Sequence, residues 1–581
     1  MTKGILQKLI REMEKLIKVA EGQVEADLVI RNAKIIDVYN HRIVEGNIAV
    51  VDGTIAGVGG NYDGKVEVDA KGSYACPGFM DSHIHVESSY LSPEKLGELV
   101  VPMGTTTLIA DPHEIVNVAG LLGLDYMIEA AEGTDLDIRY MMPSCVPATE
   151  FENSGAIVEA DDMDMSRRDI QGLGEFMNFP GVTSCNRSVL EKIAAAKRAG
   201  KIIDGHAPGL TGHQLDAYVA CGIATDHECQ TPEEMIEKMS KGMYIQLRQG
   251  SSCHDLEKLA PSVTAYNSRR CLLCSDDLQP KTILEKGHFQ NHLKIAVKNG
   301  VDPITAIQMA SLNGAECYGL SDRGAISPGK RADIVLLKDL KDFVAEKVFI
   351  QGREVADHGI YRGKMKRTSI QWVRGRFNLP KVTEKNIEVK PQNPDKAITI
   401  GLVPGGVVTE KRTASVKIDE KGRFIYDKEQ DICKIVVAER HKGTGNVAAG
   451  LLQGYGIQRG AIAVSIAHDS HNIIAAGSND TDILRAIEAL KNQEGGVVVL
   501  NHGNVVKSLP MPIAGIMSDK DPEYVKNRLT EIHDYAYDVL RINPEVDPVM
   551  TLTFMSLPVI PEIKITDMGV FDVNRFEIIN V

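Results

Sequence analysis

The sequence predicts an α/β protein, with a (β/α)8 TIM-type barrel, a flanking discontinuous β-sandwich and an α+β C-terminal domain. Three observations support this fold class. Eight strand-like runs alternate with amphipathic segments between residues 75 and 320. β-branched runs with turn residues lie on both sides of that region, and a Gly-rich segment of mixed character follows them. The 581 residues also exceed what one compact core needs, so several domains are expected.

The first predicted region, residues 1–74, holds an N-terminal helix and the first part of the β-sandwich. Its opening residues, MTKGILQKLIREMEKLIKVAEG, are amphipathic at helical spacing. They lack the continuous apolar core of a signal peptide, so we expect no secretory signal. Residues 27–58 then show β-branched runs punctuated by Asn, Gly and Asp, which predicts successive hairpins.

The barrel is predicted for residues 75–320. Amphipathic segments such as SVLEKIAAAKRAG separate most of the strand-like runs and would form the crossovers between parallel strands. An open doubly wound sheet is the alternative, because the same alternation of strands and helices also builds that fold. The eight runs are CPGFMDSHIH, TTTLIADPHE, IRYMMPSCVP, GLGEFMN, KIIDGHAPG, IATDHE, MYIQLRQGS and CLLCSDD.

Strand-like residues return after the barrel, in GAISPGKRADIVLLKDLKDFVAEKVFI. We expect residues 321–380 to supply the second part of the β-sandwich, although two separate hairpin units are compatible with the same pattern. A polar linker follows, and residues 381–581 are predicted to form the C-terminal α+β domain.

The composition indicates which cellular compartment and which classes of partner to expect. The formal net charge is −14 without a basic cluster, so we expect no nucleic acid partner. No apolar run approaches the roughly 20 residues of a membrane span, so no membrane association is expected. The 10 cysteines are scattered, which indicates a reducing cytoplasm. Cys271 and Cys274 have C-x-x-C spacing but would face opposite sides of a strand, so a structural role is expected. We also expect a homo-oligomer, a dimer or larger.

Histidines and carboxylates lie at the predicted carboxyl ends of five barrel strands, where barrels of this type carry their chemistry. One such residue alone is usually solvated or caps a helix, but this group includes an H-x-H pair whose side chains share a face. Four imidazoles and two carboxylates exceed what one catalytic ion needs, and fit two ions about 3.5–4 Å apart. Without thiolates, Mn²⁺, Fe²⁺ or Zn²⁺ is expected. The candidate ligands are His83, His85, Glu175, His206, His227 and Asp276, with Glu175 as the bridge.

Several motifs together resemble a known family. PGFMDSHIH, the strand-end histidines, SDD on strand 8 and GAISPGKRADIVLL resemble the amidohydrolase superfamily, a family of metal-dependent hydrolases. Most of its binuclear members carry a carboxylated lysine on strand 4, whereas this chain has Glu175 in LGLGEFMNFPG. That departure, with ADPHEIVNVAG, DGHAPG and HKGTGNVAAGLLQGYGIQRG, resembles the adenine deaminase family, from about residue 25 to the C-terminus.

The resemblance implies hydrolytic deamination of adenine to hypoxanthine and ammonia, with Mn²⁺ or Fe²⁺ preferred. A hydroxide held between two ions would attack C6, and Asp276 would transfer its proton to the departing ammonia. The neighbouring Asp277 would point the other way in a strand. The alternatives are another hydrolase of the superfamily, acting on a cyclic amide or an N-acyl substrate, and a non-catalytic barrel scaffold.

Other polar residues are candidates for proton transfer and base recognition. ADPHE at the end of strand 2 offers Asp111, His113 and Glu114, and His113 is the leading proton shuttle because imidazole titrates near neutral pH. The alternative is that these acids cap the next helix. HDSHN in the third region could reach the barrel mouth, bind an ion or serve an interface. For binding the purine edge, QLRQGSS offers Arg248, Gln249, Ser251 and Ser252.

Overall fold

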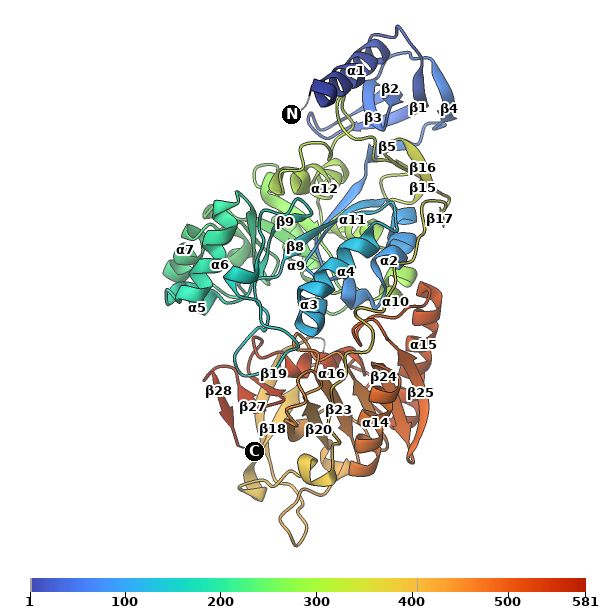
Figure 1. Ribbon diagram of the computed structural model, residues 1–581. Helices are drawn as coiled ribbons and strands as arrows, with labels where there is room; N and C mark the ends of the chain where they lie inside the picture. Colours follow the sequence, from blue (N-terminus) through green and yellow to red (C-terminus); the bar gives the residue numbers. More distant parts are fainter. Residues whose placement is uncertain (1–2, 405, 581) are drawn as a thin grey trace.

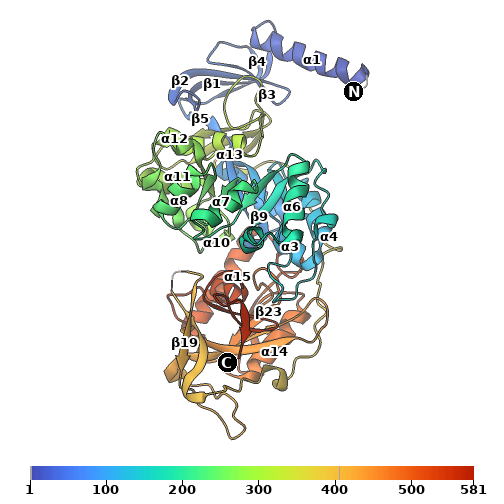
Figure 2. The same ribbon diagram turned by 90° about the vertical axis from the view of Figure 1, so that its left-hand side faces the viewer.

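The computed structural model describes residues 3–404 and 406–580. Three parts follow one another along the molecule (Figures 1 and 2): an N-terminal β-sheet unit, a central barrel and a C-terminal domain. The helix α1 (Lys3–Ala20) lies on the outer side of the β-sheet unit, as Figure 2 shows. Only its C-terminal half packs, through Leu16 and Val19, while Ile5, Leu9 and Met13 stay exposed. No helix in the described part of the chain combines the length and apolarity needed to span a membrane.

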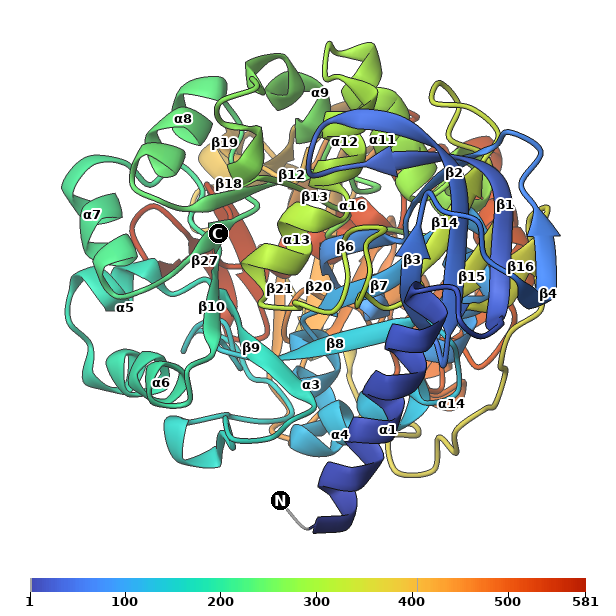
Figure 3. The ribbon, with the colours of Figure 1, turned by 90° about the horizontal axis from the view of Figure 1, so that it is seen from above.

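Eight parallel strands form the central barrel. Hydrogen-bonded ladders join β6 to β10 in chain order and β11 to β13 in chain order. The two ladders meet on both sides: Ala224 N donates to Ile203 O at 2.9 Å, and Asp276 N donates to His83 O at 2.9 Å. The sheet therefore closes into a ring, seen from above in Figure 3, and the open doubly wound alternative is wrong. The strands are β6 (Phe79–Ile84), β7 (Thr105–Ala110), β8 (Asp137–Met142), β9 (Ile170–Phe176), β10 (Ile202–Gly205), β11 (Thr225–Asp226), β12 (Tyr244–Arg248) and β13 (Cys271–Cys274).

The helices around the barrel begin where the sequence supplies caps. The Thr231 hydroxyl accepts from Glu234 N at the start of α8, and the Asn186 side chain accepts from Ser188 N at the start of α6. The helices are α2 (Pro93–Val100), α3 (His113–Ala119), α4 (Leu121–Ala131), α5 (Phe179–Thr183), α6 (Arg187–Arg198), α7 (Gly212–Ala220), α8 (Pro232–Ser240), α9 (Asp255–Leu259), α10 (Pro280–Lys286), α11 (Phe289–Lys298), α12 (Pro303–Met309) and α13 (Leu312–Cys317).

The two β-rich flanks form one unit. Strand β5 pairs antiparallel with β14, with Ala75 opposite Leu336, and this pairing joins the flanks in a nine-stranded sheet. Ile30 and Ile48 from the first flank pack in one buried cluster with Phe349 from the second. The alternative of two separate hairpin units is therefore wrong. The strands are β1 (Ala26–Asp37), β2 (Arg42–Val51), β3 (Thr54–Val58), β4 (Gly64–Asp69), β5 (Tyr74–Pro77), β14 (Ile334–Leu337), β15 (Ala345–Ile350), β16 (Arg353–Asp357) and β17 (Ile360–Tyr361).

The C-terminal domain is α+β, as predicted. Its eight-stranded sheet is covered on one face by α14 (Asp480–Asn492), which buries Ile483, Ile487 and Leu490 against the strands. A three-stranded sheet, β26 (Ile563–Thr566), β27 (Gly569–Asp572) and β28 (Glu577–Ile579), follows the helices α15 (Pro522–Tyr535) and α16 (Met550–Thr553). The large sheet contains β18 (Ala397–Leu402), β19 (Thr409–Ala414), β20 (Ile432–Ala438), β21 (Val447–Gln453), β22 (Ala461–Val464), β23 (Ile473–Gly477), β24 (Gly496–Asn501) and β25 (Asn504–Pro510).

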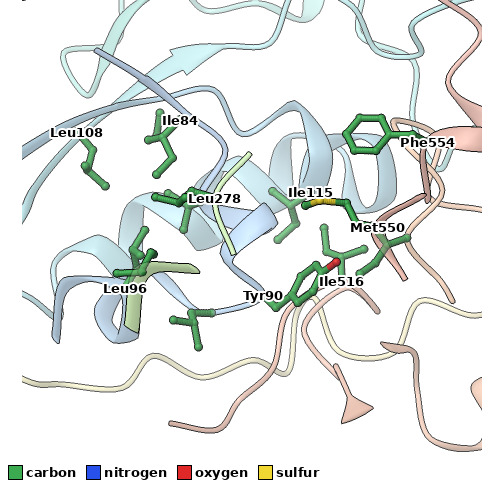
Figure 4. Packing of buried hydrophobic residues seen from close by; sticks show 14 of the residues in the cluster. Ile84, Tyr90, Leu96, Leu108, Ile115, Leu278, Ile516, Met550 and Phe554 are labelled. Carbon is green, nitrogen blue, oxygen red and sulfur yellow. The ribbon is translucent and has the colours of Figure 1, made fainter. Parts of the chain in front are cut away.

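The barrel and the C-terminal domain share an apolar core. Tyr90 and Ile115, which follow strands β6 and β7, belong to the same buried cluster as Ile516, Met550 and Phe554 of the C-terminal domain. Figure 4 shows these side chains meeting across the boundary. Because apolar burial stabilises in proportion to the area removed from water, this cluster fixes the C-terminal domain against the barrel.

Candidate metal centre

The six predicted ligands converge at the carboxyl end of the barrel. The sequence places each of them at or just after the end of its strand, so strand closure alone brings them to one rim. Their burial is nearly complete: the least buried side chain, that of His206, is 12% exposed. The six are His83 in β6, His85 just after it, Glu175 in β9, His206 after β10, His227 after β11 and Asp276 after β13.

The Glu175 carboxylate lies between two sets of imidazoles. Its Oε1 is 3.5 Å from His85 Nε2. Its Oε2 is 2.8 Å from His206 Nδ1 and 3.2 Å from His227 Nε2. Burial raises the pKa of this carboxyl, but hydrogen bonds from His206 and His227 outweigh burial and hold the pKa well below its usual value. Glu175 is therefore an anion whose two oxygens face different sides of the centre.

His83 and Asp276 complete the group. The His83 ring stacks on that of His227 with centroids 4.0 Å apart. Both His83 nitrogens are buried without a hydrogen-bond partner among the described residues. Asp276 Oδ1 lies 3.0 Å from His85 Nε2 and 3.6 Å from His83 Nε2.

Ligand atoms of these residues meet closely enough to bind metal. In each of the sets His83–His85–Glu175, His83–His227–Asp276 and Glu175–His206–His227 they lie within 4.8 Å of one another. Buried imidazole nitrogens without partners are costly in a protein interior. Coordination to a divalent cation would satisfy them, so these nitrogen and oxygen donors fit a pair of such cations.

Asp111 supports this centre from behind. Its Oδ2 accepts from Glu175 N at 2.7 Å, and its Oδ1 accepts from His113 N at 3.2 Å. Strand β7 ends at Ala110 and α3 begins at His113, so the Asp111 side chain joins the start of α3 to the backbone of β9. His113 faces the centre, with Nδ1 3.4 Å from Glu175 Oε1.

Glu114, the next residue, faces the C-terminal domain. His468 Nδ1 donates to its Oε1 at 2.7 Å, and His471 Nε2 contacts its Oε2. The HDSHN segment therefore reaches the barrel mouth, which was one of the three roles that its sequence allowed. All three side chains are buried.

Comparison with known proteins agrees with this architecture. The profile of the amidohydrolase family matches residues 74–355, and that of the adenine deaminase C-terminal domain matches residues 406–577. Adenine deaminase 2 of Desulfotalea psychrophila is 56% identical over 571 residues, which cover 98% of this chain and 99% of that protein. Adenine deaminase of Ligilactobacillus salivarius is 50% identical, with 98% of each chain covered. Adenine deaminase of Nitratidesulfovibrio vulgaris is 45% identical, with 97% of this chain and 98% of that protein covered.

The chain belongs to the adenine deaminase family. The resemblance inferred from the sequence motifs is thereby confirmed. Two profiles match the barrel and the C-terminal domain separately, and the hydrogen bond between Glu114 and His468 joins the two domains at the rim of the metal centre.

Of the four residues predicted to bind the base, only Arg248 lines the cavity among the described residues. Its guanidinium, however, contacts Glu228 and lies 3.0 Å from both Asp255 Oδ2 and Asp276 Oδ2. Its donors are therefore occupied by three carboxylates. The Asp276 oxygen that Arg248 binds is Oδ2, whereas Oδ1 faces His83 and His85.

Gln249, Ser251 and Ser252 are not among the described residues that line the cavity. Gln249 Nε2 pairs with His254 Nδ1 at 2.7 Å, and Ser252 Oγ contacts the sulfur of Met550. Ser251 Oγ bonds to Thr282 at 2.8 Å, because the chain turns toward α10 once β12 has ended. The geometry does not support base recognition by these three residues.

The expected direction of Asp277 is also corrected. Strand β13 ends at Cys274, and Asp276 has a φ of +58°, so the alternation of a strand does not continue to Asp277. Asp277 lines the cavity, and its carboxylate lies within 4.8 Å of ligand atoms of His85 and Asp276. Cys271 and Cys274 are buried free cysteines of β13, as expected for structural residues.

A cavity of about 770 Å³ lies between the metal centre and the C-terminal domain. The acidic residues of its wall that the sequence analysis missed include Glu228, which directly follows His227 in TDHE. Apart from HDSHN, the sequence analysis also missed the opposite wall, which the C-terminal domain supplies. That wall contains Val407, Val408, His468, Asp469, Phe554, Leu557, Val559 and Ile560.

Proposed function

We propose that this enzyme hydrolyses adenine to hypoxanthine and ammonia, using two divalent metal ions. The observation that carries the proposal is the position of Glu175, whose two oxygens face different imidazoles at one rim of a cavity. A carboxylate in that position suits the bridge of a binuclear centre. Relatives named adenine deaminase, similar over nearly the whole chain, support the choice of substrate.

The ligands we assign are His83, His85, Glu175, His206, His227 and Asp276. Two ions held there would lower the pKa of a water molecule and so supply a nucleophile near neutral pH. Their nitrogen and oxygen donors suit Mn²⁺, which we favour, as well as Fe²⁺ and Zn²⁺.

The proton transfers are assigned to residues that face the cavity. Asp276 presents Oδ1 to the imidazoles, and we assign to it the proton of the attacking water, which then passes to the leaving amine. His113 lies beside Glu175 and lines the same cavity, so we assign to it protonation of the purine ring. Asp111 and Glu114 act indirectly by holding Glu175 and the C-terminal domain.

We also infer that the enzyme works in a reducing compartment, the cytoplasm, as a homo-oligomer. Its 10 cysteines are free. The apolar side chains of Ile5, Leu9 and Met13 on α1 are exposed and suit a contact between subunits. The net charge of −14 does not suit binding to nucleic acid.

The test is a metal-reconstitution assay. Metal-free protein is loaded with Mn²⁺ and its metal content is measured. Ammonia release is then followed with adenine and adenosine, and opening of the ring is followed with dihydroorotate. We expect ammonia and hypoxanthine from adenine only. Turnover of dihydroorotate would favour a cyclic-amide hydrolase, which β9 disfavours because its sequence, IQGLGEF, has no lysine. Protein that holds two Mn²⁺ ions and is inert toward adenine would disprove the proposal.

The assignment of Asp276 has its own control. Asp276→Asn and Asp277→Asn are compared at equal metal content, because both carboxylates line the cavity. We expect the larger loss of kcat from Asp276→Asn. If only Asp277→Asn loses activity, Asp277 carries the proton instead.

A further inference from the structure

Asp469 brings a carboxylate of the C-terminal domain into the wall of the cavity. The side chain is 5% exposed, and the residue lines the same cavity as His85 and His113. Its Oδ1 is 3.7 Å from His113 Nε2 and 3.9 Å from His468 Nδ1, both beyond hydrogen-bonding distance. Its Oδ2 is buried and has no hydrogen-bond partner among the described residues.

A buried carboxylate oxygen without a donor is costly, and few are left so in native proteins. Of the neighbouring cationic side chains, His113 approaches only Oδ1, at 3.7 Å, and the others are engaged by other carboxylates. His468 donates to Glu114, and Arg248 is bound by Glu228, Asp255 and Asp276. Asp469 is thus a residue of the cavity wall whose Oδ2 lacks a hydrogen-bond donor among the described residues.

The surrounding contacts hold Asp469 in place. His468 and His471, on either side of it, both contact the Glu114 carboxylate. The His468 ring also stacks on Phe554, with centroids 4.5 Å apart. The segment is therefore anchored to the barrel on both sides of Asp469, and its acceptor is preorganised for a ligand in the cavity.

We propose that Asp469 is a substrate-binding residue that accepts a hydrogen bond from the imidazole-ring N–H of a free purine base. The inference rests on the proposed function, which places C6 of adenine at the metal centre. It gives the C-terminal domain a role in specificity: Asp469 supplies the polar contact, and Phe554, Val408 and Leu557 supply the apolar wall beside it. An aromatic ring on such a wall suits the flat face of a purine.

The consequence is selection against purines that are substituted at N9. Adenine retains an imidazole N–H, whereas 9-methyladenine and adenosine have none. Binding either of them would leave the Asp469 carboxylate without its donor, and sites of this kind reject the analogue strongly. The cavity of about 770 Å³ falls in the range that holds drug-sized ligands, so a methyl group is not excluded by size.

The experiment compares adenine with 9-methyladenine on Mn²⁺-loaded enzyme. KM and kcat for adenine, and the inhibition constant of 9-methyladenine, are measured for the wild type, Asp469→Asn and Asp469→Ser. The control is Asp572→Asn, which removes another buried carboxylate of the same domain that Lys411 binds at 2.8 Å. Metal content and thermal midpoint are recorded for each variant.

We expect both Asp469 variants to raise KM for adenine by about 10- to 100-fold, the usual effect of losing a hydrogen bond to a charged group. The inhibition constant of 9-methyladenine should not rise, because that ligand has no N–H donor to lose a partner. The control should leave both constants unchanged. If the two ligands weaken by the same factor, Asp469 has only a structural role and the inference is overturned.

A variant that loses a metal ion along with its affinity would also overturn the inference, because Asp469 would then be a metal ligand. Failure of the proposed function looks different: the wild type with two ions bound would release no ammonia from adenine. If the wild type is active and the variants keep its KM and its preference for adenine, only the role of Asp469 fails.

Discussion

His468 of the C-terminal domain donates a buried hydrogen bond of 2.7 Å to Glu114 of the barrel. The two residues are 354 positions apart in the chain. Glu114 belongs to the first turn of α3, next to His113, and His468 is followed by Asp469. This bond therefore joins the two domains at the cavity where we place the substrate.

This bond predicts a pH-dependent contribution to stability. Burial lowers the pKa of His468, but the charge of Glu114 and its hydrogen bond outweigh burial and raise the pKa to about 9. The unfolded value is about 6.5, so the stabilisation is complete below about pH 6.5 and is lost as pH rises toward 9. The difference corresponds to about 3 kcal/mol. We expect His468→Gln to lower the thermal midpoint strongly at pH 6 and weakly at pH 9.5.

The matched control is His213→Gln, an exposed histidine of α7 that should have little effect at either pH. An equal loss of thermal stability by His468→Gln at pH 6 and pH 9.5 would contradict the assignment of a charged His468.

The buried Lys564 is expected to make stability depend on pH in the opposite direction. It is fully buried in β26, and its Nζ donates to Val407 O at 2.7 Å. Burial lowers its pKa to about 7, whereas the unfolded value is about 10.4. The unfolded chain binds more protons between these values, so stability rises with pH from about 7 to about 10. Below pH 7 the cost approaches about 5 kcal/mol.

We therefore expect Lys564→Met to raise the thermal midpoint at pH 6.5 and to have a much smaller effect at pH 10. The exposed Lys396, in the same domain, provides the control as Lys396→Met. A gain for Lys564→Met that is the same at both pH values would show that the ammonium is not desolvated in the fold.

We expect metal binding to depend on the Glu175 carboxylate. Replacement by Gln removes the negative charge that faces His85 on one side and His206 on the other. Because even residues that only support metal ligands change affinity by 10–100-fold, we expect Glu175→Gln to weaken binding by about 100-fold or more. Metal content by elemental analysis should fall below two ions per chain, and adenine turnover should fall with it. Glu67→Gln, on the exposed strand β4, should keep both ions. Two ions retained by Glu175→Gln would rule out the bridging role.

Arg248 is expected to act on stability rather than on recognition of the base. Its guanidinium neutralises Glu228, Asp255 and Asp276 in a buried cluster. Removing one partner of a buried charge cluster costs about 3–5 kcal/mol, so Arg248→Met should lower the thermal midpoint clearly. The exposed Arg187 provides the control as Arg187→Met. A raised KM for adenine with an unchanged midpoint would instead support the base-binding role.

The sequence was sufficient to predict the barrel strands and to select the candidate metal ligands. Each of the eight strand-like runs overlaps one barrel strand, because strand formation depends on local patterns of β-branched and turn residues. His83, Glu175, His206 and Asp276 could be selected because polar residues at the ends of buried strands are a local signal as well. The fold then brings those ends to one rim.

Tertiary structure alone decided the remaining features. Closure of the barrel, the pairing of β5 with β14 and the partners of Arg248 depend on contacts between distant segments, which no local pattern encodes. The direction of Asp277 depends on the φ of +58° at Asp276, which ends the strand alternation. Asp469 reaches the cavity because two domains pack together through a shared apolar core. Local sequence sets backbone preference and burial, whereas the meeting of side chains far apart in the chain is fixed only when that core forms.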